Sequence, residues 1–354
     1  MITHLRLSNF RNFESLDQPL GPGFTILAGE NAQGKTSFLE ALYWLSTARL
    51  LRGQRDGEAV RHGAAGCTAE ATLEGGTTVA GALEVGARKK FFLNGASLPR
   101  AADVMGRIPT VCISMFDLAI VQGDPSDRRL FLDMELSALY PSYLRHFAAY
   151  KRALEQRNAL LKMAQERSVD PLAFEGWEEQ LELHGAEIRR FREEYVASLS
   201  SLSALVHQEM ASREEVLSLR YFVRDSGGTL GLTRGLDIAR GSTQVGPHRD
   251  DVEVLIDGTE ARLFGSQGQQ RTAVISLKLA TMEAWKDLLG VAPLLLLDDM
   301  LSDLDPVRRS RLCAVVSSRA SQAVLTCTEA SAAGAEILGV AEVLTVQNGT
   351  VRRG

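Results

Sequence analysis

Gly29-Glu30-Asn31-Ala32-Gln33-Gly34-Lys35-Thr36 fits the phosphate-binding loop pattern G-x-x-x-x-G-K-[ST] at every fixed position. Residues 24–28 before it read as a buried strand and residues 37–45 after it as a helix, which is the context this loop needs. We expect the loop, with Ser37, to bind a nucleoside triphosphate through its backbone N–H groups. Lys35 would reach the β and γ phosphates, and the Thr36 hydroxyl would ligate Mg2+. The alternative is a chance match in a glycine-rich turn.

Composition sets the broad class of the protein. The chain has 354 residues, enough for one large domain or two, and its 45% hydrophobic and 23% charged residues are typical of a soluble globular protein. The longest apolar stretch, residues 291–297, is far shorter than the ~18 residues of a membrane span, and residues 1–4 do not begin a signal peptide. We therefore expect a cytoplasmic protein with no membrane partner.

Charge and cysteine content limit the possible partners and sites. The net charge of -5 argues against a generally basic surface, so binding to nucleic acid would need a local patch. The four cysteines are widely spread and show no metal-ligand spacing: Cys67, Cys112, Cys313 and Cys327. We expect them to be buried thiols rather than disulfides or zinc ligands.

The pattern along the chain changes twice. Residues 1–125 read as short antiparallel strands around a nucleotide-binding core, with a tight turn at Asn94-Gly95 and a helix cap at Ser126 or Asp127. Residues 127 to about 206 show helical spacing and predict an antiparallel hairpin broken at 168–171, within a helical insert lobe at 126–240. Its arms, about thirty residues each, would be no longer than roughly 45 Å. His184 falls on the apolar seam of this hairpin, where we expect a packed core residue.

Residues 241–354 return to alternating strands and helices. We expect a strand hairpin at 251–263, a long helix at 268–289 and a buried strand at 293–297. Asp305-Pro306 would cap a helix that runs to about residue 319, and strands would follow at 323–327 and 343–346. The prediction is an α/β fold: a P-loop ATPase head with a mixed sheet and an antiparallel β subdomain, interrupted by a helical hairpin lobe.

Residues 294–299, four leucines followed by Asp298 and Asp299, read as a Walker B element. In this arrangement the first carboxylate, Asp298, supports Mg2+, and the second, Asp299, orients an attacking water as the catalytic acid, with Lys35 stabilising the phosphates. Taken alone, the run could equally be a buried strand with a solvated end. A phosphate-binding loop in the same chain favours the functional interpretation.

Residues 264–272 resemble the signature motif of ATP-binding-cassette proteins. Ser266 and Gln269 predict a capping box, so the helix from Gly268 would begin with free N–H groups and a positive dipole end suited to a γ phosphate. The expected signature residues are Ser266, Gln267, Gly268 and Gln269. An ordinary helix cap is the alternative. Ser302-Asp303-Leu304-Asp305 matches the D-loop of the same superfamily. The resemblance implies a homodimer that closes over two ATP molecules, with the signature of one copy facing the nucleotide of the other.

Four segments point further than the superfamily. Residues 5–13 look like the N-terminal strand of SMC-like repair ATPases, and residues 123–133, 245–251 and 266–271 resemble the RecF family, with matching length and motif order. The resemblance implies ATP-dependent binding of double-stranded and gapped DNA, dimerisation on ATP binding, slow ATP hydrolysis, and work with RecO and RecR to load RecA at single-strand gaps. It also adds Arg11 and Asn12 to the expected nucleotide-binding residues.

The chain departs from the family pattern in places that bear on turnover. Residues 114–118 read Ser-Met-Phe-Asp-Leu where Ser-Pro-Glu-Asp-Leu is usual, which leaves the glutamine loop unassigned, and residues 326–328 offer no switch histidine. Because Asp299 is shorter than the glutamate of fast cassette ATPases, we expect slow turnover, with ATP acting as a dimer clamp.

Other functions remain possible at this point. The alternatives are the nucleotide-binding subunit of a membrane transporter, another SMC-like DNA repair ATPase, and a small-molecule kinase. Candidate DNA contacts are basic residues flanking the nucleotide lobe: Arg52, Arg55, Arg61, Arg88, Lys89 and Lys90. Each could instead be a solvated surface charge.

Overall fold

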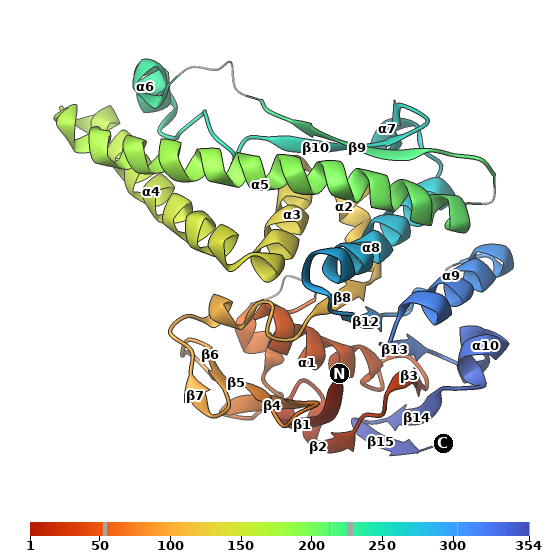
Figure 1. The fold of residues 1–354 in the computed structure, drawn as a ribbon. Helices are drawn as coiled ribbons and strands as arrows, with labels where there is room; N and C mark the ends of the chain where they lie inside the picture. The colour runs from red at the N-terminus through yellow and green to blue at the C-terminus, as the bar shows by residue number, and fades with distance from the viewer. Residues whose placement is uncertain (52–54, 212, 225–228, 303, 354) are drawn as a thin grey trace. The chain divides into compact units, whose positions relative to one another are not determined.

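The computed structural model describes residues 1–51, 55–211, 213–224, 229–302 and 304–353 (Figure 1). The chain forms two compact units. Unit 1 comprises residues 1–118, 205–214 and 271–354, and unit 2 comprises residues 119–204 and 215–270. The three-segment division at residues 125 and 240 stays a prediction.

A six-stranded mixed sheet forms one layer of unit 1, in the order β15-β14-β3-β13-β12-β8. Its strands are β3 (Gly23–Ala28), β8 (Thr110–Ile113), β12 (Leu294–Leu297), β13 (Gln322–Cys327), β14 (Glu342–Gln347) and β15 (Thr350–Arg353). All neighbours run parallel except β14 and β15, which form a hairpin. The strands expected before the phosphate loop and before the Walker B acids are therefore present, with β13 between them.

A second sheet of unit 1 is antiparallel throughout, in the order β2-β1-β4-β5-β6-β7. Its strands are β1 (Ile2–Phe10), β2 (Phe13–Pro19), β4 (Gly66–Leu73), β5 (Thr78–Glu84), β6 (Lys90–Leu93) and β7 (Ala96–Ser97). The predicted antiparallel subdomain and the turn at Asn94-Gly95 are confirmed. Helix α1 (Lys35–Thr47) contacts strands of both sheets, and its apolar side chains join both in one core.

The other helices of unit 1 follow the sequence closely. Helix α8 (Gln267–Leu289) enters unit 1 at residue 271, α9 (Pro306–Arg319) follows the Asp305 cap, and α10 (Gly334–Leu338) is a single turn. The described residues also form the 3-10 helices η1 (Asp56–Ala59), η2 (Ala101–Val104), η3 (Met115–Leu118) and η4 (Ala330–Ala333). The long helix and the capped helix are confirmed.

Helices make up most of unit 2: α2 (Ala119–Gln122), α3 (Pro125–Leu139), α4 (Pro141–Glu166), α5 (Leu172–Met210), α6 (Leu230–Arg240) and α7 (Ala261–Phe264). The predicted hairpin is α4 and α5, but the arms are unequal, at 26 and 39 residues, or about 39 and 58 Å. The limit of 45 Å is wrong for α5, because this helix runs unbroken from Leu172 to Met210 rather than for about thirty residues.

Local predictions in unit 2 also need correction. The N-cap of α3 is Asp124, not Ser126 or Asp127, because Pro125 occupies the first helical position; Asp127 accepts a hydrogen bond from the Asp124 N–H at 2.9 Å. His184 is half-buried rather than in the core, and its Nδ1 lies 3.0 Å from Nδ1 of His146. Burial and His146 lower the pKa of His184.

A three-stranded antiparallel sheet completes unit 2, in the order β11-β10-β9. The hairpin of β10 (Asp251–Ile256) and β11 (Thr259–Glu260) around Asp257-Gly258 is confirmed, although residues 261–264 form α7 and not strand. Strand β9 (Leu217–Phe222) and helix α6 lie in a stretch for which the sequence predicted no element.

The core of unit 1 depends on close contact between Trp44 and Gly81. A β-carbon at Gly81 would lie 2.5 Å from the Trp44 ring and 2.9 Å from Phe91. We predict that Gly81→Ala lowers the free energy of unfolding by about 1–3 kcal/mol, as overpacking does. Gly21→Ala is the matched control, because no atom lies within 4 Å of its added β-carbon. Equal denaturation midpoints for the two variants would contradict this packing.

Candidate nucleotide-binding site

The phosphate loop joins β3 to α1 in a backbone shape that requires glycine. Gly29 and Gly34 have φ angles of 153° and 120°. A β-carbon at Gly34 would lie 2.5 Å from Nδ2 of Asn12, and one at Gly29 would lie 2.4 Å from the Val346 carbonyl oxygen. The two glycines of the motif are thus set by close neighbours as well as by backbone conformation.

Two turns, distant in sequence, hold the loop at Gln33. Asn12, in the turn between β1 and β2, donates from Nδ2 to the Gln33 carbonyl oxygen at 2.9 Å. In the turn between β14 and β15, the Gly349 N–H donates to the same oxygen at 3.0 Å, and the Asn348 N–H donates to Gln33 Oε1 at 2.8 Å. The sequence shows that Asn348-Gly349 is a turn but not that it touches the loop.

The Lys35 side chain folds back onto the phosphate loop and binds its backbone carbonyl oxygens. Its ammonium group donates to the Gly29 carbonyl oxygen and, at 2.9 Å, to that of Glu30. Lys35 is buried, so the loop carbonyls hold the charge at the N-terminus of α1. Phosphate oxygens can accept hydrogen bonds from the same ammonium group.

Two threonines donate hydrogen bonds to Asp298 of the Walker B pair: Thr36 of the phosphate loop and Thr326 of β13. Asp298 Oδ1 accepts hydrogen bonds from Thr36 Oγ1 at 2.9 Å and from Thr326 Oγ1 at 3.0 Å. Thr326 also accepts from the Asp299 N–H at 2.8 Å, and Asp299 Oδ1 accepts from Ser302 at 2.5 Å. The two expected Mg2+ ligands, Thr36 and Asp298, are therefore brought together, and Thr326 is a member that sequence reasoning missed.

A cavity of about 760 Å³ opens over the loop. It is lined by Arg11, Asn12, Asn31, Ala32, Gly34, Lys35, Thr36, Ser37, Glu58, Val60, Arg61, His62, Asp299 and Thr326. This volume is in the range of small-molecule and cofactor sites. The start of α1, the ammonium group and the hydroxyls suit a triphosphate. Mg2+ takes few protein ligands and keeps phosphate and water oxygens, so Thr36 and Asp298 fit it.

Arg11 reaches the cavity from the turn after β1. Its guanidinium group makes two hydrogen bonds to the Glu40 carboxylate, at 2.6 and 2.9 Å, and Glu40 is itself buried. This bidentate pair fixes the orientation of Arg11 on one wall of the cavity. Glu58, Val60 and His62 line the same cavity, and Glu58 lies 3.9 Å from the Arg11 guanidinium group. These three residues had no recognisable motif in the sequence.

The signature residues of unit 2 form the predicted capping box. The Ser266 N–H donates to Gln269 Oε1 at 2.8 Å, and the Gln269 N–H donates to Ser266 Oγ at 3.3 Å. Ser266 and Gln267 are exposed, and Gly268 is half-buried. The start of α8 therefore faces outward from its own unit.

Comparisons with known proteins agree with this constellation. Residues 1–351 match the family described as RecF/RecN/SMC N terminal domain. The chain is 40% identical to a DNA replication and repair protein RecF from Symbiobacterium thermophilum, covering 93% of this chain and 91% of that protein. It is 35% identical to the RecF of Thermosynechococcus vestitus, covering 98% and 96%. The chain belongs to the RecF family.

Solved structures support the same assignment. The recombination mediator protein RecF, described as RecF-ATPrS in the RecFOR pathway, superposes with a TM-score of 0.89 and 29% identity, covering 100% of this chain and 98% of that one. An Smc head bound to the C-winged helix domain of ScpA has a TM-score of 0.58 and 13% identity, covering 99% and 96%. The fold is thus the α/β ATPase head with a helical lobe that the RecF resemblance implied.

The D-loop is described only in part, because Asp303 lies outside the described residues. Ser302 donates to Asp299, as above, whereas Asp305 caps α9 by accepting from the N–H groups of Val307 and Arg308 at 3.1 and 3.0 Å. The hydrogen bond from the Arg308 N–H holds the pKa of Asp305 below its usual range. The observed role of the Asp305 carboxylate is therefore to cap α9.

The RecF-family departure at residues 114–118 forms a closed turn. Asp117 Oδ2 accepts from the Ser114 N–H at 2.7 Å and from its hydroxyl at 2.9 Å.

All four cysteines are free and buried, as predicted. Burial raises the pKa of the Cys327 thiol to about 11, so it is a packing residue and not a nucleophile beside the loop.

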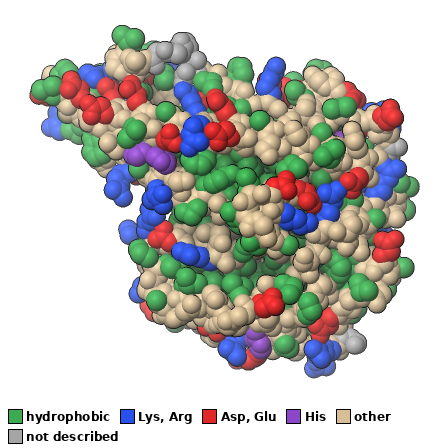
Figure 2. All heavy atoms as spheres, viewed as in Figure 1, with side chains coloured by type: hydrophobic (Ala, Val, Ile, Leu, Met, Phe, Trp, Pro, Cys, Tyr) green, Lys and Arg blue, Asp and Glu red, His purple; other side chains and the backbone are tan. Residues whose placement is uncertain are grey.

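The candidate DNA contacts of unit 1 are scattered. Arg55, Arg88 and Lys90 are exposed, whereas Arg61 pairs with Glu14 at 3.2 Å and Lys89 pairs with Asp56 at 2.7 Å. Arg52 lies outside the described residues. On the face drawn in Figure 2, basic and acidic side chains are interspersed. The prediction that these six residues contact DNA stays a prediction.

The turn at Asn348-Gly349 offers a test of how the loop is held. Gly349 and Gly75 both have a left-handed backbone, with φ angles of 69° and 84°. A β-carbon at Gly349 would lie 2.4 Å from the Asn12 carbonyl oxygen, whereas one at Gly75 meets no atom within 4 Å. We predict that Gly349→Ala weakens ATP binding on the order of tenfold, or about 1.4 kcal/mol, and that Gly75→Ala does not. Calorimetric titration checks this, and equal affinities would show that the turn does not support the loop.

Proposed function

We propose that this protein is an ATP-dependent DNA-binding protein of DNA replication and repair, in which ATP closes a homodimer on DNA. The observation that carries the proposal is the Thr36–Asp298 hydrogen bond, which joins the phosphate loop to the Walker B strand beside a cavity of about 760 Å³. Membership of the RecF family supplies the DNA context. RecF relatives are DNA replication and repair proteins by name.

The residues of unit 1 have distinct roles in this proposal. Gly29, Gly34 and the intervening backbone cradle the phosphates, and Lys35 neutralises their charge. Thr36 and Asp298 hold Mg2+, which stabilises charge on the phosphate oxygens. Asp299 orients the attacking water from a position fixed by Ser302. Its short side chain gives slow hydrolysis, so the ATP-bound state persists.

The signature residues of unit 2 supply the second half of the site in trans. Ser266 and Gln267 are exposed at the start of α8, where the positive end of the helix dipole favours a phosphate. Leu263 and Phe264, just before them, are 67% and 72% exposed. Exposed apolar side chains beside a polar helix start are the composition expected of a surface that a second copy covers.

RecO and RecR are the proposed protein partners, with RecA loading at single-strand gaps as the outcome. The support is the relatedness to a recombination mediator protein described in the RecFOR pathway. Among the described residues, no helix is long and apolar enough to cross a bilayer. We place the protein in the cytoplasm on the strength of the DNA-repair assignment.

Sedimentation with ATP and a DNA duplex tests the trans signature. Lys35→Met should lose nucleotide binding and remain monomeric. Ser266→Arg should bind ATP normally but stay monomeric and bind duplex at least tenfold more weakly, because the larger cation blocks the start of α8. Ser201→Arg, at an exposed serine of unit 2 outside the signature, is the control and should dimerise like wild type. Normal dimerisation of Ser266→Arg would rule out the trans-signature site.

Turnover measurements test the role of Asp299. Asp299→Asn keeps the side-chain size and an oxygen that can accept from Ser302, but it cannot orient water as a carboxylate does. We predict at least a tenfold lower rate of phosphate release, with ATP affinity within threefold of wild type and a longer-lived dimer. A wild-type protein that hydrolysed ATP rapidly without DNA, or an Asn variant with unchanged turnover, would refute the clamp role.

A further inference from the structure

Unit 2 contains a second polar cavity that the nucleotide site does not use. It has a volume of about 370 Å³ and is lined by Pro125, Ser126, Arg129, Arg224, Gln244 and Arg249. Three of its six lining residues are arginines, and none is acidic. Two of them, Arg129 and Arg249, belong to two of the three sequence segments that resemble RecF, residues 123–133 and 245–251. The nucleotide chemistry above leaves both segments without a role.

The arginines of this cavity belong to a cluster with excess positive charge. The cluster consists of Arg128, Arg129, Arg189, Arg192, Arg224 and Arg249 with Asp133, Asp250 and Asp251. Asp133 pairs with Arg192 at 2.6 Å and Asp250 with Arg189 at 2.7 Å. The third carboxylate, Asp251, is shared by two guanidinium groups.

Arg128 binds Asp251 at 2.8 Å, and Arg224 binds its other oxygen at 3.0 Å. The three acids of the cluster are thus fully engaged. Arg129 and Arg249 are left with backbone oxygens as their side-chain partners: Arg129 donates to the Asp250 carbonyl at 2.8 Å and Arg249 to the Thr243 carbonyl at 3.3 Å. Burial, followed by the nearby Arg192, lowers the pKa of Arg129. Among the described residues, neither arginine forms an ion pair.

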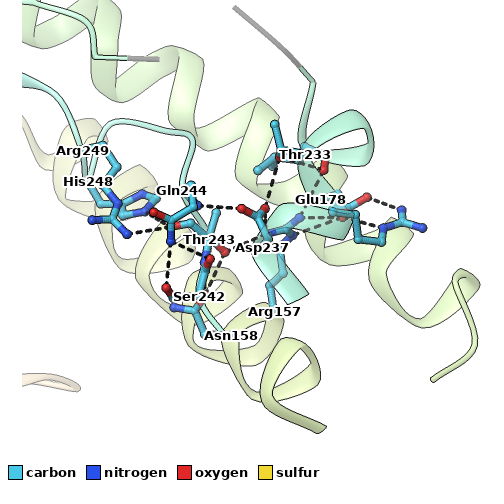
Figure 3. A network of polar contacts seen from close by, with 12 residues as sticks. Arg157, Asn158, Glu178, Thr233, Asp237, Ser242, Thr243, Gln244, His248 and Arg249 are labelled. Carbon is cyan, nitrogen blue, oxygen red and sulfur yellow. Dashed lines mark hydrogen bonds and ion pairs between the residues drawn. The ribbon is translucent and has the colours of Figure 1, made fainter. Parts of the chain in front are cut away.

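A buried polar network fixes the loop that carries Gln244 and Arg249 (Figure 3). Arg157 is fully buried and donates to Asp237 and to the Thr243 hydroxyl, each at 2.8 Å. The Gln244 N–H donates to Asp237 at 3.0 Å. Figure 3 shows Arg249 beside His248 at the end of this network away from Arg157.

His248 adds a second anchor to the same loop. Its Nε2 lies 3.0 Å from the Thr243 carbonyl oxygen, which identifies Nε2 as the protonated nitrogen, and Nδ1 lies 2.6 Å from the Tyr150 hydroxyl. Burial lowers the pKa of His248 to about 4, so the ring is neutral at physiological pH. These contacts therefore anchor the loop backbone that carries Arg249, and the neutral ring contributes no compensating charge.

We propose that Arg129, Arg224 and Arg249 form a binding site for a backbone phosphate of DNA. Guanidinium groups bind phosphate oxygens through two parallel N–H donors, and a preorganised set of them loses little side-chain entropy on binding. Ser126 adds a hydroxyl donor at the start of α3. The site makes no base contact, so it binds duplex regardless of sequence. This inference rests on the proposed DNA-binding function, and it locates DNA contact in unit 2.

The test uses the full-length protein with ATP and a fluorescent duplex over a range of salt concentrations. Arg249→Gln is the main variant, because the exposed side chain makes one long hydrogen bond and its loss should leave the melting temperature unchanged. Arg190→Gln is the matched control: it removes the same charge from α5 of the same unit, at a side chain paired with Glu187 and Glu194.

We expect Arg249→Gln to weaken duplex binding about tenfold at low salt. It should also reduce the slope of log affinity against log salt by about 0.9 for each copy that contacts the duplex. Arg249→Lys should retain the slope, because it keeps the charge, while losing part of the affinity. ATP affinity and ATP-dependent dimerisation should not change in any of the three variants.

Three results would overturn the site. One is an unchanged affinity and salt slope in Arg249→Gln, and another is an equal loss in Arg190→Gln, which would indicate general electrostatics. The third is displacement of duplex by polyglutamate as effectively as by unlabelled duplex, which would assign the cavity to an acidic protein segment. A wild-type protein that does not bind duplex with ATP would instead refute the proposed function, and the phosphate site with it.

Discussion

The Asp298 carboxylate is the interaction on which the ATPase unit depends. It stands at the end of β12 and accepts hydroxyl hydrogen bonds from Thr36, at the start of α1 after β3, and from Thr326 on β13. The Asp298 N–H donates to the carbonyl of Ile113 at the end of β8. One residue therefore aligns the carboxyl ends of four parallel strands, which is the edge where open α/β sheets bind ligands. The same geometry places two oxygen ligands suited to Mg2+ beside the phosphate loop, so the bond that orders the sheet also builds the site.

Much of this arrangement can be predicted from sequence, because the relevant signals are local. The phosphate loop, the Walker B run and the capping box each need fixed residue types within a few positions, and their flanking strands and helices show clear apolar periodicity. Buried strands such as β12 and β13 stand out as short apolar runs between turn residues. The Asp305 cap and the Asn348-Gly349 turn were equally readable, since each depends only on its neighbours. The order of these motifs along the chain then supported the resemblance to RecF.

What the sequence could not show is long-range pairing. Strand β9 is an ordinary polar and apolar mixture, and it is a strand because β10 pairs with all six of its residues. Helix α5 exceeds its expected length and runs without a break across the boundary at residues 204 and 205. The buried Arg157 reads as one more surface charge on an amphipathic helix, yet its partners Glu178 and Asp237 lie on other helices. Thr326 belongs to no recognisable motif. It can bind Asp298 only because β13 lies between β3 and β12, the two strands that lead into the phosphate loop and the Walker B acids.

The contact between Gln33 and the β14–β15 turn bears on how the protein is made. The phosphate loop emerges early in synthesis, but the hydrogen bonds from Asn348 and Gly349 come from residues more than three hundred positions later, as does the pairing of β14 with β3. A nascent chain can therefore contain the whole P-loop motif and still lack the hydrogen bonds that Asn348 and Gly349 donate to Gln33. The loop reaches its final shape only after the helical lobe has been translated and the late hairpin has docked. Nucleotide binding in this architecture thus reports on completion of the fold, and a chain interrupted before the hairpin does not acquire the finished site.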